Sequence, residues 1–231
     1  MKAMIFDAGP IISLTTNNLL WTLEPLKAKF GGEFYITEGV RKELVEKPLT
    51  TKKFKFEALQ VQHQIEKGVL KVIKNPEVTK KAKQMLDLAN NVFYIRKHPL
   101  QTLQLGELEA LAAAKLMKIP YIVVDERMTR LLLENPGQME QLLERRLHAD
   151  VHVKRDKLVK LHKEVEGVKL IRSLELAAIA YEHNILDDYL VKIPEARKQL
   201  LQAILWGIKL NGCSAGQNEI DAVVKIMLKK K

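Results

Sequence analysis

Two aspartates stand where a short apolar run ends and a helix-like segment begins. Asp7 follows the run AMIF in MKAMIFDAGPIISL, and Asp125 follows YIVV in YIVVDERMTRLL. An unpaired carboxylate is costly inside a buried strand, so both aspartates are expected just beyond the ends of strands. If these strands are parallel neighbours, both carboxylates lie at one edge of the sheet, the edge where α/β proteins bind ligands. The alternative for Asp7 is a turn-forming or helix-capping residue.

Three glutamates could join these aspartates. Glu107 and Glu109 lie in the first turn of the alanine-rich segment LQLGELEALAAAK, although the helix dipole by itself favours acids there. Glu43, in ITEGVRKELVEK, can share a face with the start of its helix, and an ordinary surface glutamate is the alternative. Carboxylates clustered at a sheet edge provide the oxygen ligands that Mg²⁺ and Mn²⁺ take.

Strand-like and helix-like segments alternate along the chain and would position these acids. Apolar runs predict strands at 3–6, 33–36, 69–73, 121–124 and 168–171. Helical spacing predicts helices at about 10–29, 38–46, 53–67, 76–97 and 106–118, after Asp125, after Ser173, at 194–210 and from 214 to the lysine tail. Thr37 and Ser173 are expected as helix N-caps. The alternation predicts a single three-layer α/β/α domain over residues 1–231, with a central parallel sheet and C-terminal helices over 194–231.

The segment 145–167 interrupts this alternation and is expected to be a basic insertion, either helical or a hairpin. Apolar residues recur through and just before it at helix-like intervals: Leu143, Leu147, Val151, Leu158, Leu161 and Val165. Such a stripe can pack on the body of the domain or on another copy of the chain, with the basic residues facing outward. The alternative is a mobile surface hairpin with no role.

The charge balance favours an anionic partner, with nucleic acid as the first expectation. The 231 residues carry a formal net charge of +10, and residues 47–83 (net +7) and 145–172 (net +5) are the two basic blocks. Solvated helix faces are the alternative for each block. A single cysteine, Cys213, excludes an internal disulfide framework, and no apolar run is long enough to span a bilayer. Because Asp7 also interrupts the apolar run that a signal peptide would need, we expect a cytoplasmic protein.

Four acidic motifs, in order, resemble those of PIN domains, a superfamily of metal-dependent ribonucleases that includes the toxins of many bacterial and archaeal toxin–antitoxin pairs. MIFDAGPIISL resembles the opening strand with the first acid, Asp7, and ITEGVRKEL is similar to the helix that supplies the second, Glu43. LGELEALAAAK resembles the third motif, with Glu107 as its acid and Glu109 as second choice. IVVDERMTR resembles the fourth motif, with Asp125.

The resemblance covers about residues 3–133 and resumes, more weakly, at about 168–190. It implies that the four acids hold Mg²⁺ or Mn²⁺, directly or through water, and that one of them acts as base. The implied activity is hydrolysis of single-stranded RNA by a water that the ion activates. A homodimer is also expected, because PIN domains often form dimers. An antitoxin partner is possible, but the sequence itself does not support one.

The sequence departs from the family where many members carry serine or threonine. Ala8, Gly9 and Val124 stand at such positions, and Ser13 is a partial substitute. A non-catalytic RNA-binding or assembly module that retains the fold is the alternative function, although all four acidic positions are filled. A phosphotransferase of the haloacid dehalogenase type would need a second acid two residues after Asp7, where glycine stands.

Two further groups of residues have alternative interpretations. His148, His152 and His162 make a zinc site conceivable, but no cysteine flanks them and their surroundings are basic. Arg127 and Arg130, just beyond Asp125, either contact phosphate or pair with neighbouring glutamates.

Overall fold

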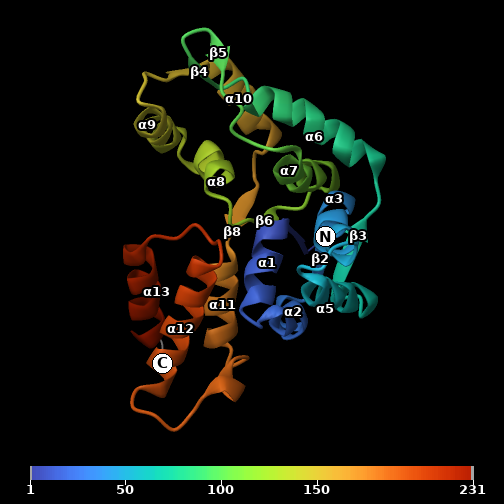
Figure 1. Ribbon diagram of the computed structural model, residues 1–231, viewed down its shortest axis with the longest axis vertical. Coiled ribbons are helices and arrows are strands. Elements are labelled where there is room, and N and C mark those ends of the chain that lie inside the picture. Colours follow the sequence, from blue (N-terminus) through green and yellow to red (C-terminus); the bar gives the residue numbers. More distant parts are fainter. Residues whose placement is uncertain (1, 230–231) are drawn as a thin grey trace.

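The computed structural model describes residues 2–229 and is built around a five-stranded parallel sheet (Figure 1). The strands lie in the order β3-β2-β1-β6-β8. Their bounds are β1 (Ala3–Phe6), β2 (Glu33–Thr37), β3 (Leu70–Ile73), β6 (Tyr121–Val123) and β8 (Lys169–Ile171). All neighbouring strands pair in parallel, so the sheet predicted from the alternation of strands and helices is confirmed.

Helices cover both faces of the sheet because its strands are apolar on both sides. In β1, Ala3 and Ile5 belong to one hydrophobic core, Met4 and Phe6 belong to the other, and all four are buried. Burial on both faces is typical of a parallel sheet. The predicted three-layer α/β/α architecture is therefore confirmed.

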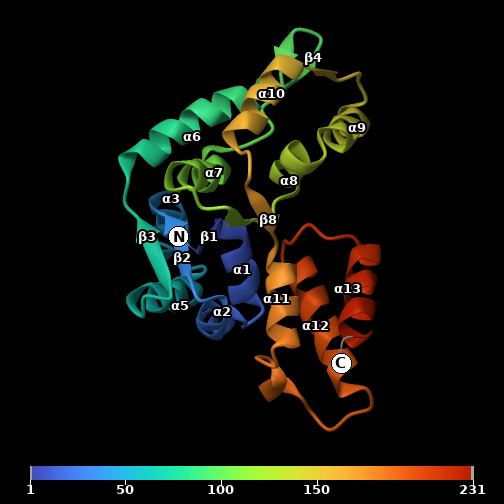
Figure 2. The same cartoon turned by 180° about the vertical axis from the view of Figure 1, so that it is seen from behind.

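The two cores assign each helix to a layer. The core around Ile5 includes α6 (Pro76–Ala89), α7 (Leu105–Met117), α8 (Arg127–Glu134), α9 (Pro136–Leu147) and α10 (Arg155–Glu164). The core around Phe6 includes α1 (Ala8–Thr16), α2 (Leu23–Phe30), α3 (Glu38–Arg41), α5 (Lys55–Glu66), α11 (Ser173–Glu182), α12 (Ala196–Leu210) and α13 (Gln217–Lys229). Figures 1 and 2 show α11, α12 and α13 side by side, with α11 next to α1. Within residues 2–229, no helix has the length and apolar character needed to cross a bilayer.

The single helix expected over 10–29 is wrong. Helix α1 ends at Thr16, a 3₁₀ turn follows at Leu20–Thr22, and only then does α2 begin. Asn18 lies between them with a left-handed backbone (φ 56°), a conformation that ends helices. The break turns the chain so that α1 and α2 cover the sheet separately.

The helix expected over 76–97 is also too long, because α6 ends at Ala89. The chain then forms β4 (Phe93–Ile95), whose first residue is fully buried. Strand β4 pairs antiparallel with β5 (His98–Pro99) and β7 (His152–Val153) in a second, three-stranded sheet. The segment Phe93–Ile95 therefore forms a partly buried strand, although its apolar residues have helical spacing.

The basic segment 145–167 packs on the body of the domain. It contains the end of α9, strand β7 and helix α10, and β7 adds to the second sheet. Val151, Leu161 and Val165 are buried in the same core as α6 and α7, whereas Leu147 is exposed. The stripe thus packs mainly on the body, one of the two arrangements expected for it, and does not form a hairpin confined to the surface.

One of the two predicted N-caps is confirmed. The Thr37 hydroxyl accepts a hydrogen bond from the Val40 amide, 3.2 Å away, at the start of α3. Ser173 is not the N-cap of α11; Arg172 takes that position, and Ser173 is the first helical residue. Residues 230–231 of the expected C-terminal helix lie outside the described residues.

Candidate functional site

Asp7 and Asp125 flank the point where the order of strands along the sheet reverses. From β1 the chain proceeds outward through β2 to β3, then returns to the other side of β1 with β6 and β8. Phe6 of β1 pairs with Val123 of β6, and the Asp7 amide donates to the Val123 carbonyl at 2.9 Å. Asp125 follows two residues after β6. The two strands are therefore parallel neighbours, as predicted, and their carboxyl ends meet at the usual ligand-binding position of an α/β sheet.

Asp7 occupies the N-cap position of α1, but its side chain makes no capping hydrogen bond. The residue is 7 % exposed. Burial raises the pKa of its carboxyl from 3.8 to about 6, and the charges of Glu43 and Asp125 add to the rise. The amides of Ala8 and Gly9 oppose that rise without cancelling it. The carboxyl thus interacts with the first amides of α1, but these interactions do not offset its burial beside Glu43 and Asp125.

Asp125 is held in a fixed orientation by serines from two helices. Its Oδ2 accepts hydrogen bonds from the Ser13 hydroxyl of α1 (2.8 Å) and the Ser173 hydroxyl of α11 (2.6 Å). Its Oδ1 accepts one from the Ser173 amide at 2.8 Å. A Cβ at Gly9 would lie 3.6 Å from the Asp125 Cβ and 3.9 Å from Asp7 Oδ2, so Gly9 lies between the two acids. Ser13 reaches the site, as predicted, whereas the role of Ser173 was missed.

Glu43 and Glu107 approach from the ends of two other helices. Glu43 lies on η2 (Lys42–Glu46), a π-helical segment that continues α3, and π-helical turns occur frequently at functional sites. A Cβ at Gly106, the neighbour of Glu107, would lie 4.0 Å from Glu43 Oε2. The acid from η2 therefore reaches the start of α7.

The Glu107 side chain has one engaged oxygen. Its Oε2 accepts hydrogen bonds from the Gln104 amide (3.3 Å) and the Thr129 hydroxyl (3.2 Å). Burial raises the pKa of Glu107 from 4.5 to about 7, and the charges of Glu126 and, less strongly, Asp7 add to the rise. Part of its role is thus to cap α7, while its charge still interacts with the aspartate that follows β1.

Glu109, the second choice for the third acid, has a different environment. It is 7 % exposed, and its two oxygens accept hydrogen bonds from the hydroxyls of Thr37 (3.1 Å) and Thr79 (3.0 Å). A Cβ at Gly39 would lie only 2.0 Å from Glu109 Oε2, so the backbone of α3 packs directly on this carboxylate. Glu109 joins α7 to β2 and α6, and these contacts favour Glu107 as the acid of the site.

The four candidate acids have no basic partner. Among residues 2–229, none of Asp7, Glu43, Glu107 and Asp125 forms an ion pair, although ion pairs are frequent elsewhere on this basic chain. The described side chains include no group of three His, Cys, Asp or Glu residues already arranged to hold a metal ion. The donor set nevertheless fits Mg²⁺ or Mn²⁺ chemically, because these ions prefer carboxylate oxygens.

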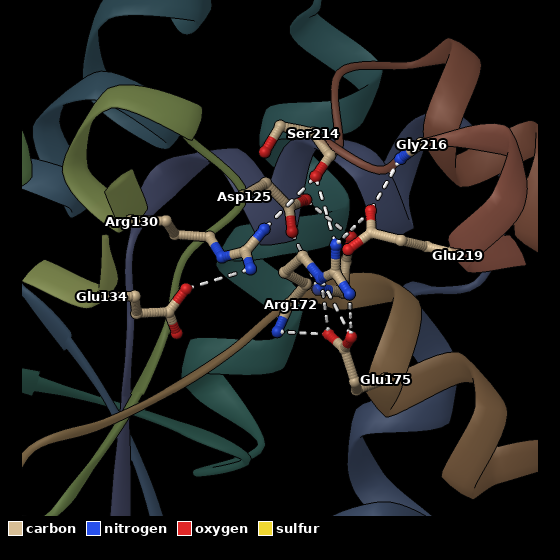
Figure 3. Close-up of polar contacts among 9 residues, drawn as sticks. Asp125, Arg130, Glu134, Arg172, Glu175, Ser214, Gly216 and Glu219 are labelled. Carbon is tan, nitrogen blue, oxygen red and sulfur yellow. Dashed lines mark hydrogen bonds and ion pairs between the residues drawn. The ribbon is translucent and has the colours of Figure 1, made fainter. Parts of the chain in front are cut away.

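The loop between α12 and α13 is tied to the backbone of Asp125 (Figure 3). The Ser214 amide donates to the Asp125 carbonyl at 3.1 Å. The Ser214 carbonyl accepts from Nη1 of Arg172 (3.2 Å) and Nη1 of Arg130 (3.3 Å). Arg172, whose side chain is 9 % exposed, also forms ion pairs with Glu175 and Glu219. The C-terminal helices thus help to position the carboxylate that follows β6.

The other side chains near Asp125 have assignable roles. Burial, with the charge of Asp125 next, raises the pKa of the Cys213 thiol to about 12, so it stays neutral. Arg130 pairs with Glu134 at 3.1 Å, in line with the prediction of a pairing with a neighbouring glutamate. Arg127 is exposed on a polar cleft of about 730 Å³ between α8 and residues 214–219, which include the start of α13.

The three histidines that made a zinc site conceivable lie on different elements. His148 follows α9, His152 lies on β7, and His162 lies on α10, where its Nε2 contacts the Leu132 carbonyl at 3.1 Å. These positions give no support to a zinc site among the described residues.

Comparison with known proteins identifies the fold family. A protein-family model described as a PIN domain matches residues 3–138, which include β1 through the start of α9 and all four candidate acids. No curated protein and no solved structure matches the chain. The matched segment, more than half of the chain, carries the motifs whose order and strand context resemble those of PIN domains. The chain therefore belongs to the PIN-domain family.

Proposed function

We propose that this chain is a metal-dependent endoribonuclease that hydrolyses phosphodiester bonds of single-stranded RNA. Asp7, Glu43, Glu107 and Asp125 are the proposed ligands of Mg²⁺ or Mn²⁺, directly or through water. Membership of the PIN-domain family supports nuclease activity in general, and PIN domains typically use divalent metals. The choice of RNA and the four-acid metal site are our proposals.

The observation that carries the proposal is the set of uncompensated acids at the strand-order reversal. The protein has a net charge of +10, yet no described Lys or Arg side chain pairs with these four acids. Burial raises the pKa of Asp7 to about 6 and that of Glu107 to about 7, and neighbouring carboxylates add to both. Carboxylates this close repel one another, so a bound cation would stabilise their ionised forms.

The side chains divide the proposed work between them. Ser13 and Ser173 orient the Asp125 carboxylate, and the free Oε1 of Glu107 and the buried Asp7 carboxyl supply further oxygens. A divalent ion held by these acids would lower the pKa of a bound water and stabilise charge on the phosphodiester. The acid nearest the attacking water takes its proton.

The experiment is cleavage of a labelled single-stranded RNA by the full chain. We expect products with Mg²⁺ or Mn²⁺, none with EDTA, and none from the Asp7→Asn variant, which keeps the shape of the side chain and removes its charge. Single-stranded DNA of the same sequence tests the choice of RNA. If a folded protein binds RNA but does not cleave it with either ion, the chain is instead the non-catalytic RNA-binding module that the sequence left as an alternative.

A further inference from the structure

An apolar groove lies beside the acid cluster. Its volume of about 460 Å³ falls within the range of small-molecule pockets, roughly 300–1,000 Å³. The apolar part of its lining is Ile11 and Ile12 of α1, Leu44 of η2, Pro48 of α4 (Lys47–Leu49), and Phe54 and Val61 at and within α5. We call it the Phe54 groove. Glu43, one of the proposed ligands, also lines it, so the groove and the candidate metal site share this residue.

Phe54 has an unusual conformation for an aromatic residue. Its backbone is left-handed (φ 62°), which bulky side chains rarely adopt, and the residue is 50 % exposed. It stands at the N-cap of α5 but makes no capping hydrogen bond. Backbone strain of this kind is concentrated at functional sites. The helix end itself therefore gives no reason for a phenylalanine here.

Two lysines without an ion-pair partner among the described residues line the same groove. Lys47 and Lys53 line the groove, and the Lys53 ammonium lies 4.7 Å from the centroid of the Phe54 ring. Neither forms an ion pair among the described residues, whereas Lys67 and Lys71 of the same basic block pair with glutamates. An exposed aromatic ring with one lysine over it and a second lysine in the same groove is an arrangement that can bind single strands, with a base on the ring and phosphates at the cations.

We propose that the Phe54 groove binds one base of the single-stranded RNA, next to the phosphodiester that reaches the acid cluster. The base stacks on Phe54, and the adjoining phosphates lie at Lys47 and Lys53. Stacking of this kind tolerates any base, because every base presents a π face. The inference rests on the proposed function, since it assigns a subsite for the same substrate.

The test measures affinity for a fluorescent single-stranded RNA in the full chain carrying Asp7→Asn, which is expected not to cleave. In that background Phe54→Asn removes the ring, and asparagine accepts a left-handed backbone, so the start of α5 is preserved. We expect affinity to fall about tenfold, and Phe54→Trp to restore it. Phe56→Ala is the matched control, because Phe56 is 68 % exposed two residues away and does not line the groove.

A second single-stranded RNA, which carries abasic sites, distinguishes a loss of stacking from a general loss of binding. If the groove holds a base, the abasic strand binds weakly and is insensitive to Phe54→Asn. The inference is overturned if Phe54→Asn lowers the affinity equally for both RNAs, or if it does not lower the affinity for natural RNA. Unchanged affinity for natural RNA would fit a groove that receives a protein segment. Mg²⁺-dependent cleavage by the chain with Phe54 and Asp7 intact is measured separately, so the proposed function can stand if the subsite fails.

Discussion

At the residue scale, Asp7 links the proposed metal site to the stability of the fold. The pKa of its carboxyl is raised from 3.8 to about 6, chiefly by burial and then by Glu43 and Asp125. A group with a raised pKa in the folded state binds protons more tightly there than in the unfolded chain. Asp7 therefore makes its full favourable contribution to the free energy of unfolding below about pH 4. This contribution is lost as the pH rises through about 6, because the buried carboxyl then ionises.

Asp7→Asn should therefore stabilise the metal-free protein at pH 8. We expect the free energy of unfolding to rise by up to about 3 kcal/mol, because the variant has no charge to bury. At pH 4.5 most of this gain should disappear. Urea unfolding in EDTA at the two pH values measures the difference, with Asp150→Asn, a change at an exposed acid, as control. A variant that is less stable at pH 8, or equally stabilised at both, would contradict the assignment.

Glu107 and Glu109 should respond differently to removal of their charge. Glu107→Gln should reduce the increase in melting temperature that Mn²⁺ causes, because it removes a proposed ligand. Glu109→Gln should keep that increase while lowering the melting temperature itself, because both of its oxygens accept from threonine hydroxyls. Thermal melts with and without Mn²⁺ decide between them. The reverse pattern would make Glu109 the third acid.

At the element scale, Arg172 joins the helix after β8 to the C-terminal pair of helices. Its guanidinium bridges Glu175 of α11, Glu219 of α13 and the Ser214 carbonyl. Both glutamate side chains are more than a third exposed, so solvent screens much of the ion-pair energy. The buried guanidinium and the bond to the Ser214 carbonyl remain.

Arg172→Gln should lower the free energy of unfolding by about 1–3 kcal/mol, because it leaves the Ser214 carbonyl with fewer donors and opens a packed position. Arg130→Gln is the matched control: it removes the other donor to the same carbonyl, but its ion pair with Glu134 lies on the surface. Denaturant unfolding should show a clearly smaller loss for the control. Equal losses would mean that Arg172 does not hold the C-terminal helices in place.

Local patterns predicted the elements whose partners are near in sequence. The run Ala3–Phe6 is apolar at every position, and the sheet buries it on both faces. The strand and the acid that follows it could therefore be predicted from the sequence. Glu107 and Glu109 share one helical turn, and partners brought in by other elements distinguish them, such as Thr37 and Thr79 at Glu109. Such long-range partners cannot be read from spacing.

The same limit explains the other discrepancies. Ser173 follows a strand and precedes a helix, which is the pattern of an N-cap, but its hydroxyl bonds to Asp125, 48 residues earlier. The helix expected over 10–29 kept its apolar spacing across Asn18, where the left-handed backbone breaks it.

At the scale of the whole molecule, the charge of the first basic block is divided unequally. Lys67, Lys71, Lys80 and Lys81 form ion pairs with glutamates. The lysines of this block that line the Phe54 groove or adjoin its lining in sequence form no ion pair among the described residues: Lys47, Lys52, Lys53 and Lys55. The second set is available to phosphates, as are Lys74 and Lys83, which also form no ion pair among the described residues but do not line the groove.

Replacing Lys47, Lys52, Lys53 and Lys55 by glutamine should therefore flatten the salt dependence of RNA affinity. Each lost phosphate contact should reduce the slope of log K against log salt by about 0.7. The same replacement of Lys67, Lys71, Lys80 and Lys81 changes the net charge equally and is the control. Equal changes in slope would mean that the charge acts over the whole surface rather than beside the groove.

The homodimer implied by the family resemblance stays a prediction, and an antitoxin partner stays a possibility that the sequence itself does not support. Light scattering of the full chain, alone and with RNA, tests the first. Deletion of 145–167 is not a suitable test, because Val151, Leu161 and Val165 belong to the core.

The most direct test of the account is whether divalent metal binds at the acid cluster. Mn²⁺ at about 100 times its dissociation constant should add about 2.7 kcal/mol to the free energy of unfolding and raise the melting temperature by several degrees. The Asp7→Asn/Glu43→Gln variant should lose this increase, and Asp150→Asn should keep it. Asp125 is left intact, because three hydrogen-bond donors point at its carboxylate. The native chain should show the increase and the double variant none; equal increases in both would mean that the ion binds away from Asp7 and Glu43.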